Sequence, residues 1–217
     1  MGGAGDKKGH GGDDEFLWLV SLSDLMILLF VFFVVLYSFA GKNMKQQDFL
    51  RISASLRHEA APKDPIDEVE SNVKKWVTSL KLGDKVMVKK EDDALRVDIT
   101  DRLLFSTGDF EPHTQGQHVI GLMKGILEKV PVPYQIGIEG HTDDDPIHTT
   151  QIKDNWDLSA KRALSVMHTM GLTPGTLKRT VLMAYGDQRP LVPNRDKKGN
   201  AIPLNQAKNR RVTIRIF

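Results

Sequence analysis

The stretch IEGHTDDDPIHTTQIKDNWDLSAKRAL, residues 138–164, decides how the second half of this chain folds. It starts with the end of a predicted strand, passes through a polar loop, and continues into a predicted helix. Asp143 lies just past the strand, and Asn155 lies near the helix start, where a capping residue is expected. Ser159 and Arg162 follow on the next turns. Polar side chains between a strand end and a helix start predict a ligand site.

Asp143 and Arg162 supply one carboxylate and one guanidinium near the start of the helix. Together they could bind a small ligand that carries both an amine and a carboxylate, because each charge would meet its opposite. The same spacing allows a simpler arrangement, in which Asp143 and Arg162 pair with each other and only support the fold. The spacing alone favours the simpler arrangement and leaves the other open.

The loop of this stretch is also rich in residue types that bind metals or carry out hydrolysis. Its spacing matches no recognised zinc or calcium motif, and no further His or Cys supports a metal site. Ser159 has neither a nucleophile-elbow context nor an evident base, which argues against a hydrolase. We therefore expect no metal and no enzyme activity from this cluster, which contains His141, Asp143, Asp144, Asp145 and His148.

Strand-like and helix-like patterns alternate from about residue 84 to the C-terminus. The β-β-α-β-α-β-β order predicts an α+β sandwich of one mixed sheet and two main helices. The expected strands are two within 85–100, then 134–141, 180–186 and 209–217, and the expected helices are 113–130 and 155–171.

The N-terminal part of the chain contains the apolar segment FLWLVSLSDLMILLFVFFVVLYSFA, residues 16–40. At 1.5 Å per residue it is long enough to cross a hydrocarbon core of about 30 Å. A signal peptide usually has a shorter apolar core of about 7–15 residues and a basic start. Here the preceding residues, GGDDEF, are acidic. We therefore expect a retained transmembrane helix.

Asp24 is the one charged residue of this segment. A charge at the middle of a membrane helix costs about 2.5–3.5 kcal/mol on insertion scales, so an acid there indicates a function. Asp24 follows Phe16 by eight residues, about 12 Å along a helix. In the alternative, a shorter span over 25–40 leaves Asp24 at the interface. The longer span predicts that Asp24 takes up and releases a proton within the membrane.

The rest of the chain is less informative. A net charge of +2, with no aromatic-interleaved basic tract, argues against nucleic-acid binding, and the absence of cysteine excludes a disulfide scaffold. Residues 1–15 are expected to be a tail, residues 42–60 fit a short amphipathic helix, and residues 61–65 break it. A further helix is expected over 66–80, leading towards the folded part.

Three motifs in order resemble those of the OmpA-like peptidoglycan-binding domain: GHTD at 140–143, NWDLSAKRA at 155–163 and NRRV at 209–212. The resemblance covers about residues 84–217. It implies that Asp143 and Arg162 hold the diaminopimelate of the peptide stem and that Asn155 supports the loop. The gap between Asp143 and Asn155 is longer than in porin and lipoprotein members. It is similar to that of the flagellar motor branch.

The segment 16–40 independently resembles the membrane helix of MotB and PomB, the B subunits of flagellar stators. The resemblance implies that Asp24 binds the transported ion, H⁺ or Na⁺, and that residues 41–60 form a plug, followed by a linker over 61–83. The only implied cofactor is the transported ion. Implied partners are a second copy in a homodimer, a MotA/PomA-type polytopic membrane subunit around that dimer, peptidoglycan and, indirectly, the flagellar rotor. The segment looks slightly closer to the sodium-type subunits.

The implied location is a bacterial inner membrane, with residues 1–15 cytoplasmic and residues 84–217 periplasmic. The positive-inside rule weakly predicts the reverse, but it is a poor guide when a long domain follows the span. Two other functions stay open: a passive membrane-to-peptidoglycan anchor, and a subunit of another ion-driven machine, such as gliding or phage defence. The basic residues near the span are Lys7 and Lys8 before it and Lys42, Lys45, Arg51 and Arg57 after it.

Overall fold

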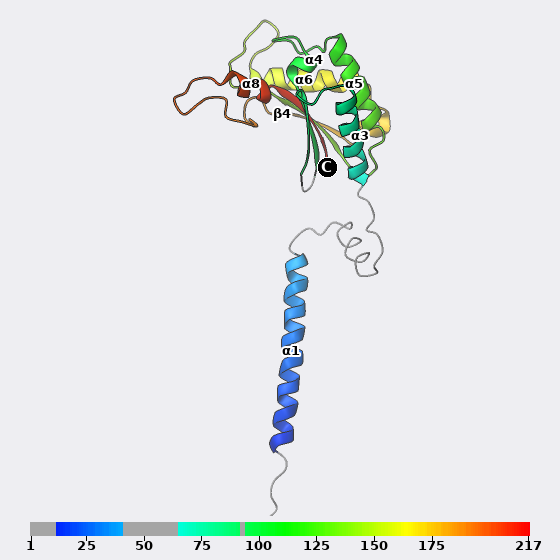
Figure 1. Ribbon diagram of the computed structural model, residues 1–217, viewed down its shortest axis with the longest axis vertical. Coiled ribbons are helices and arrows are strands. Elements are labelled where there is room, and N and C mark those ends of the chain that lie inside the picture. Colours follow the sequence, from blue (N-terminus) through cyan, green and yellow to red (C-terminus); the bar gives the residue numbers. More distant parts are fainter. Residues whose placement is uncertain (1–11, 41–64, 92–93) are drawn as a thin grey trace, which may run out of the picture. The chain divides into compact units, whose positions relative to one another are not determined.

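A computed structural model describes residues 12–40, 65–91 and 94–217 of the chain. The chain divides into two units, Met1–Lys63 and Asp64–Phe217, which are considered separately below (Figure 1). The expected plug-like segment 41–60 and most of the expected tail 1–15 lie outside the described residues.

The first unit contains one long helix, α1, which spans Gly12–Ala40 (Figure 1). Within the described residues it is the only helix long and apolar enough to cross a membrane, over Trp18–Ser38. None of this 21-residue window is buried by other parts of the protein, and at 1.5 Å per residue it is about 31 Å long. The apolar segment expected over residues 16–40 is therefore a continuous helix that includes Asp24.

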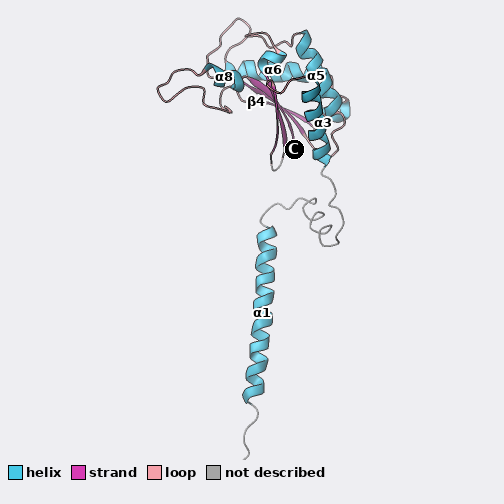
Figure 2. Ribbon diagram, in the orientation of Figure 1, coloured by secondary structure: helices cyan, strands magenta, loops and turns pink. Residues whose placement is uncertain are grey.

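The second unit is built on one mixed five-stranded sheet in the order β1-β2-β5-β3-β4. Its strands are drawn in magenta in Figure 2. β3 and β4 are parallel, and the other neighbouring strands are antiparallel. This confirms the predicted α+β fold with one mixed sheet. The strands are β1 (Val86–Lys90), β2 (Leu95–Thr100), β3 (Ile136–His141), β4 (Thr180–Ala184) and β5 (Arg211–Ile216).

Two main helices, α5 (Thr114–Leu127) and α6 (Asn155–Met170), pack together, and α6 packs on β3 and β4. Both were predicted, and α6 ends as expected at Gly171, whose φ of 52° is left-handed and suits glycine. The core between helices and sheet contains Ile138, Ile214 and Val166. Three short helices were not predicted: α4 (Asp101–Leu104), α7 (Pro174–Leu177) and α8 (Pro203–Asn209).

The segment expected to be a linker, residues 61–83, contains helix α3 (Pro65–Ser79). Its apolar residues recur at helical spacing, and they are buried in the core of the second unit. The folded unit therefore starts at Asp64 and not at residue 84. The buried residues of α3 are Ile66, Val69, Val73 and Val77.

Gly140 on β3 allows the sheet and α6 to approach each other closely. A Cβ built on Gly140 would lie 2.0 Å from the carbonyl oxygen of Ser159 in α6. Because only glycine fits there, the end of β3 and the start of α6 are held side by side. Within residues 138–164, the polar residues that follow β3 therefore lie close to those at the start of α6.

Candidate functional site

A cleft lies at one edge of the sheet, where the ends of three strands meet. Thr100 at the end of β2 and His141 at the end of β3 both pair with Arg211 at the start of β5. Residues just beyond β2 and β3 and just before β5 therefore emerge at the same edge. The cleft has a volume of about 320 Å³ and is completed by the first turns of α6. Its charged lining consists of Asp101, Arg102, Asp143, Asp145, Arg162 and Arg210.

Asp143 is buried at the end of β3 and forms an ion pair with Arg210. The Nε of Arg210 also lies 3.3 Å from Oδ2 of Asp101, so one guanidinium bridges two carboxylates. Burial lowers the pKa of Arg210, but its contacts with Asp143 and Asp101 outweigh burial and raise it above the ordinary value. Arg210 therefore stays charged and holds both acids at the cleft.

Arg162 lies on α6 with only 2% of its surface exposed. Its Nε donates to the carbonyl oxygen of Asp109 at 3.0 Å, and its Nη1 lies 3.6 Å from Oδ2 of Asp101. The guanidinium carbon stands 5.1 Å from the ring centroid of Phe105. The side chain is therefore fixed on three sides, as a preformed anion-binding group requires.

Burial has opposite effects on the two members of this ion pair. It raises the pKa of the Asp101 carboxyl above its usual value, although Arg162 and Arg210 oppose this. It lowers the pKa of Arg162, although Asp101 opposes this. Within the described residues, Oδ1 of Asp101 and Nη1 of Arg162 are buried without a hydrogen-bond partner. The cleft thus offers an unused acceptor and an unused donor.

Asn155 fixes the loop that follows Asp143. Its Nδ2 donates to the carbonyl oxygen of Asp143 at 3.2 Å and to that of Asp145 at 3.1 Å. It does not cap α6: Asp154 is the N-cap, and its side chain accepts from the backbone N–H of Asp157 at 2.8 Å. The expected capping position was therefore one residue late, because Asp154 and Asn155 are both good caps in sequence. The loop support implied for Asn155 matches this geometry.

The structure brings Asp143, Asn155 and Arg162 together in one cleft. Within the described chain Asp143 pairs with Arg210 and Arg162 pairs with Asp101, so the simpler arrangement of a direct Asp143–Arg162 pair is wrong. Sequence reasoning missed Asp101 and Arg210. Asp101 directly follows a predicted strand, and Arg210 lies inside the NRRV motif near the start of another. Their positions at strand ends could have indicated that both residues belong to the cleft.

The other polar residues of the loop have partners within the protein. Ser159 donates to the carbonyl oxygen of Trp156 and accepts from the backbone N–H of Gly186, so it joins helix to loop. Asp144 pairs with Arg195. A search of the described residues finds no group of three or more His, Cys, Asp or Glu that could hold a metal ion.

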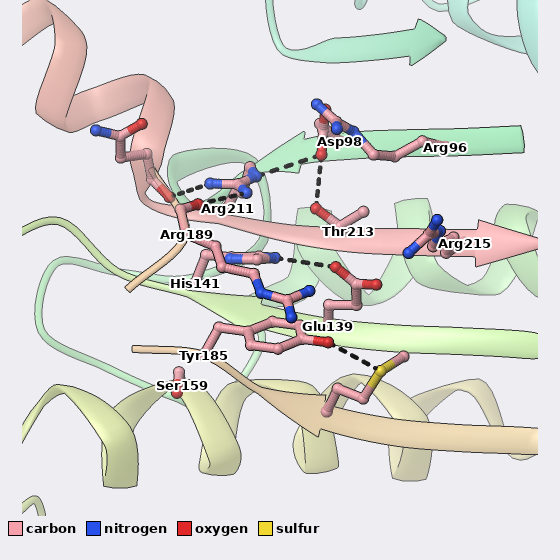
Figure 3. A network of polar contacts seen from close by, with 12 residues as sticks. Arg96, Asp98, Glu139, His141, Ser159, Tyr185, Arg189, Arg211, Thr213 and Arg215 are labelled. Atoms are coloured by element: carbon pink, nitrogen blue, oxygen red, sulfur yellow. Dashed lines mark hydrogen bonds and ion pairs between the residues drawn. The ribbon is translucent and has the colours of Figure 1, made fainter. Parts of the chain in front are cut away.

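A polar network, most of it buried, lies along β2, β3 and β5 (Figure 3). Nε2 of His141 lies 3.2 Å from Oε2 of Glu139, and the His141 ring stacks on Tyr185 with centroids 5.3 Å apart. Arg189 covers Tyr185, with its guanidinium carbon 3.9 Å from the ring centroid. Asp98 accepts from Thr213 at 2.6 Å and pairs with Arg211. These contacts fix the strand ends that carry Asp143 and Arg210.

Asp24 is the second candidate site, in the separate N-terminal unit. It lies six residues after Trp18, about 9 Å along the window Trp18–Ser38, and its side chain is exposed on α1. Apolar side chains surround it along the helix, including Leu25 and Leu28. Its carboxylate therefore lies within the candidate span, as expected for the longer of the two spans.

Comparison with known proteins matches both units. Residues 4–59 match a family model described as membrane MotB of the proton-channel complex MotA/MotB, and residues 104–202 match the OmpA family. Motility protein B of Bacillus subtilis is 26% identical, with 97% of this chain and 94% of the relative covered. The chain is therefore similar to a MotB protein over nearly its full length.

The folded unit is also similar to solved structures. The periplasmic domain of Helicobacter pylori MotB matches with a TM-score of 0.53 and 26% identity, covering 63% of this chain and 81% of that one. The cell wall anchor of the type VI secretion system of Pseudomonas aeruginosa matches with a TM-score of 0.56 and 27% identity. That match covers 66% of this chain and 94% of the other.

Proposed function

We propose that this chain is the B subunit of a flagellar stator, which couples ion flow across the membrane to torque while anchored to peptidoglycan. The MotB and OmpA family-model matches, the similar motility protein B and the OmpA-like fold support the stator assignment and the wall anchor. The coupling ion and the partners are parts of the proposal. The two halves of the function rest on two separate sites, the cleft and Asp24.

The cleft would bind the diaminopimelate side chain of the peptide stem, which carries an ammonium and a carboxylate on one carbon. Asp143 and Asp101 would face the ammonium, and Arg162 and Arg210 would face the carboxylate. The main support is that Oδ1 of Asp101 and Nη1 of Arg162 are buried and have no hydrogen-bond partner among the described residues. Buried polar atoms without partners are costly, and a zwitterionic ligand would satisfy one of each sign. Asn155 would keep the loop of Asp143 in place.

Asp24 would bind the transported H⁺ or Na⁺ within the membrane. A cost of about 2.5–3.5 kcal/mol for an isolated membrane charge is expected to be offset by a functional partner. Since α1 is the only candidate span in the described chain, a polytopic MotA/PomA-type subunit would complete the ion path around a dimer of this chain. Ion binding at Asp24 would then drive that ring relative to the anchored dimer, and so turn the rotor.

This function places α1 in the bacterial inner membrane, with the N-terminus in the cytoplasm and the folded unit in the periplasm. Alkaline phosphatase fused after residue 60 would be active in intact cells. An inactive fusion would contradict the periplasmic location.

Wall binding is tested by co-sedimentation of the detergent-solubilised full chain with purified sacculi of the diaminopimelate type. Arg162→Lys keeps the charge but loses the planar fork, and it is expected to bind at least tenfold more weakly. Lys161→Arg, on the neighbouring residue of α6, is the matched control and should bind like the wild type. Equal binding of both variants would overturn the assignment of the cleft.

A passive wall anchor is the second candidate function, favoured by the similarity to the secretion-system wall anchor. Another ion-driven machine with MotB-like subunits is a third. A passive anchor needs no acid in its membrane helix, so Asp24 separates it from both ion-driven functions. Neighbouring genes would separate a flagellar from a non-flagellar machine.

A further inference from the structure

Three consecutive aspartates, Asp143, Asp144 and Asp145, follow β3, and all three are held from the same part of the chain. Arg210, directly before β5, pairs with Asp143. Gln206 on α8 and Arg195 on the preceding loop hold Asp144 and Asp145. Segments more than 50 residues later in the chain therefore fix a loop that forms one wall of the cleft.

Gln206 is the centre of this arrangement. Its side-chain Nε2 donates to Oδ1 of Asp144 at 3.0 Å and to Oδ1 of Asp145 at 2.9 Å. Gln206 is 4% exposed, so the amide is held in a buried position. Arg195 adds the positive charge: its Nε lies 2.6 Å from Oδ2 of Asp144 and its Nη2 lies 3.5 Å from Oδ1 of Asp145.

The helix that carries Gln206 is itself anchored. Asn209, fully buried at the end of α8, accepts from the backbone N–H of Leu191 at 2.8 Å and donates to the carbonyl oxygen of Val192 at 2.7 Å. Its Nδ2 also donates to Oδ1 of Asn194, the residue before Arg195. Gln206 and Arg195 are therefore parts of one fixed unit.

We propose that Gln206 and Arg195 form a clamp on Asp144 and Asp145, and that this clamp positions the cleft wall for peptidoglycan binding without touching the peptide stem. The inference rests on the proposed wall-binding function. Asp145 and its neighbours Pro146 and Ile147 line the cleft, whereas Gln206 and Arg195 do not. The two side chains would therefore act through the loop they hold.

The physical need for the clamp comes from charge. Asp143, Asp144 and Asp145 place three carboxylates side by side, and like charges in one loop repel each other. Burial raises the pKa of Asp144, but the hydrogen bonds from Gln206 and Arg195 outweigh burial and lower it below the usual value. Without the clamp, we expect the part of the loop that contains Asp144 and Asp145 to shift relative to Asp143. The unpaired carboxylates of Asp144 and Asp145 would then repel the carboxylates of the peptide stem.

The test uses the detergent-solubilised full chain and a purified disaccharide-tetrapeptide muropeptide, with the Kd measured by calorimetry. Arg195→Gln removes the charge of the clamp, and Gln206→Glu places a carboxylate against two others. Each variant is expected to bind about fivefold more weakly or worse, since hydrogen bonds to charged groups are lost. Lys198→Gln, which removes the same charge from the same loop without a side-chain contact to Asp144, is the matched control and should keep the wild-type Kd. A wild-type Kd for both clamp variants would overturn the proposal.

A double-mutant cycle separates positioning from direct contact. In a background that carries both Asp144→Asn and Asp145→Asn, Arg195→Gln should cause little further loss if it acts through these two carboxylates. The full loss in that background would mean that Arg195 contacts the wall itself, and would overturn the proposal. If Gln206→Glu has a lower melting temperature than the wild type, the Kd of Arg195→Gln decides the result, because the Arg195 side chain is exposed.

Failure of the proposed function gives a different result. If Arg162→Lys binds the muropeptide as well as the wild type does, the cleft is not the wall site. If Arg162→Lys loses binding while Arg195→Gln and Gln206→Glu do not, only the clamp is wrong.

Discussion

Arg162 and Asp101 form a buried ion pair at the cleft, in which Nη1 of Arg162 lies 3.6 Å from Oδ2 of Asp101. In the described chain, Nη1 of Arg162 and Oδ1 of Asp101 have no hydrogen-bond partner. Leaving a buried polar atom unpaired costs about 1–3 kcal/mol. The fold therefore buries one carboxylate acceptor and one guanidinium donor at the same place, and each lowers the stability of the free protein. A ligand that carries both an ammonium and a carboxylate would satisfy both, which supports the proposed binding of diaminopimelate.

The first prediction concerns Asp101, which sequence reasoning did not identify. Asp101→Asn keeps the shape but removes the negative charge beside Arg162 and Arg210. We expect muropeptide binding to weaken about tenfold or more, because a charge-assisted hydrogen bond to the ligand ammonium is lost. Calorimetry on the full chain measures it, with Glu68→Gln on the exposed face of α3 as control. Unchanged affinity would show that Asp101 supports the fold only.

The second prediction concerns the close approach of β3 and α6. Gly140→Ala places a methyl group 2.0 Å from the carbonyl oxygen of Ser159, and backbone must shift to accommodate it. Overpacking of this kind lowers the free energy of unfolding by about 1–3 kcal/mol. Gly121→Ala on α5 is the matched control, since a Cβ there meets nothing within 4 Å and alanine favours helix. Chemical denaturation should show that Gly140→Ala is destabilised and that Gly121→Ala is unchanged or stabilised. Equal free energies of unfolding for the two variants would contradict the close packing at Gly140.

The third prediction concerns pH and His141. Burial lowers the pKa of His141, although Glu139 and Asp98 oppose it, and Arg211 lowers it further. Tyr185 stacks on its other side, under Arg189. Because the folded pKa is below the unfolded value of about 6.5, stability is lost as pH falls below 6.5. The melting temperature of the wild type should therefore fall more between pH 7.5 and 5 than that of His141→Gln. Parallel curves would exclude His141 as the cause.

Sequence patterns predicted the sheet and the main helices well, because apolar periodicity and the glycine at position 171 are local signals. The same local signals identified Asp143, Asn155 and Arg162 as neighbours of a strand end and a helix start. They could not predict which charges pair. Arg210 reaches Asp143 across 67 residues, a contact that only the order of the strands creates.

The start of the folded unit was misjudged for a related reason. The helix of residues 65–79 was predicted, but the face it buries is set by packing on the core, which sequence does not reveal. The start of α6 was predicted only to within one position, because Asp154 and Asn155 are both good capping residues.

In the proposed function, one chain joins an ion-binding acid in the membrane to a wall anchor. Asp24→Asn separates these two roles in cells that depend on this chain for swimming, with sacculus binding measured in parallel. Asp24→Glu keeps a carboxylate, and Ser23→Ala controls for local change in the helix. Asp24→Asn is expected to abolish swimming while the full chain still binds sacculi like the wild type, and Ser23→Ala is expected to change neither. Full swimming of the Asp24→Asn strain would show that Asp24 does not carry the transported ion.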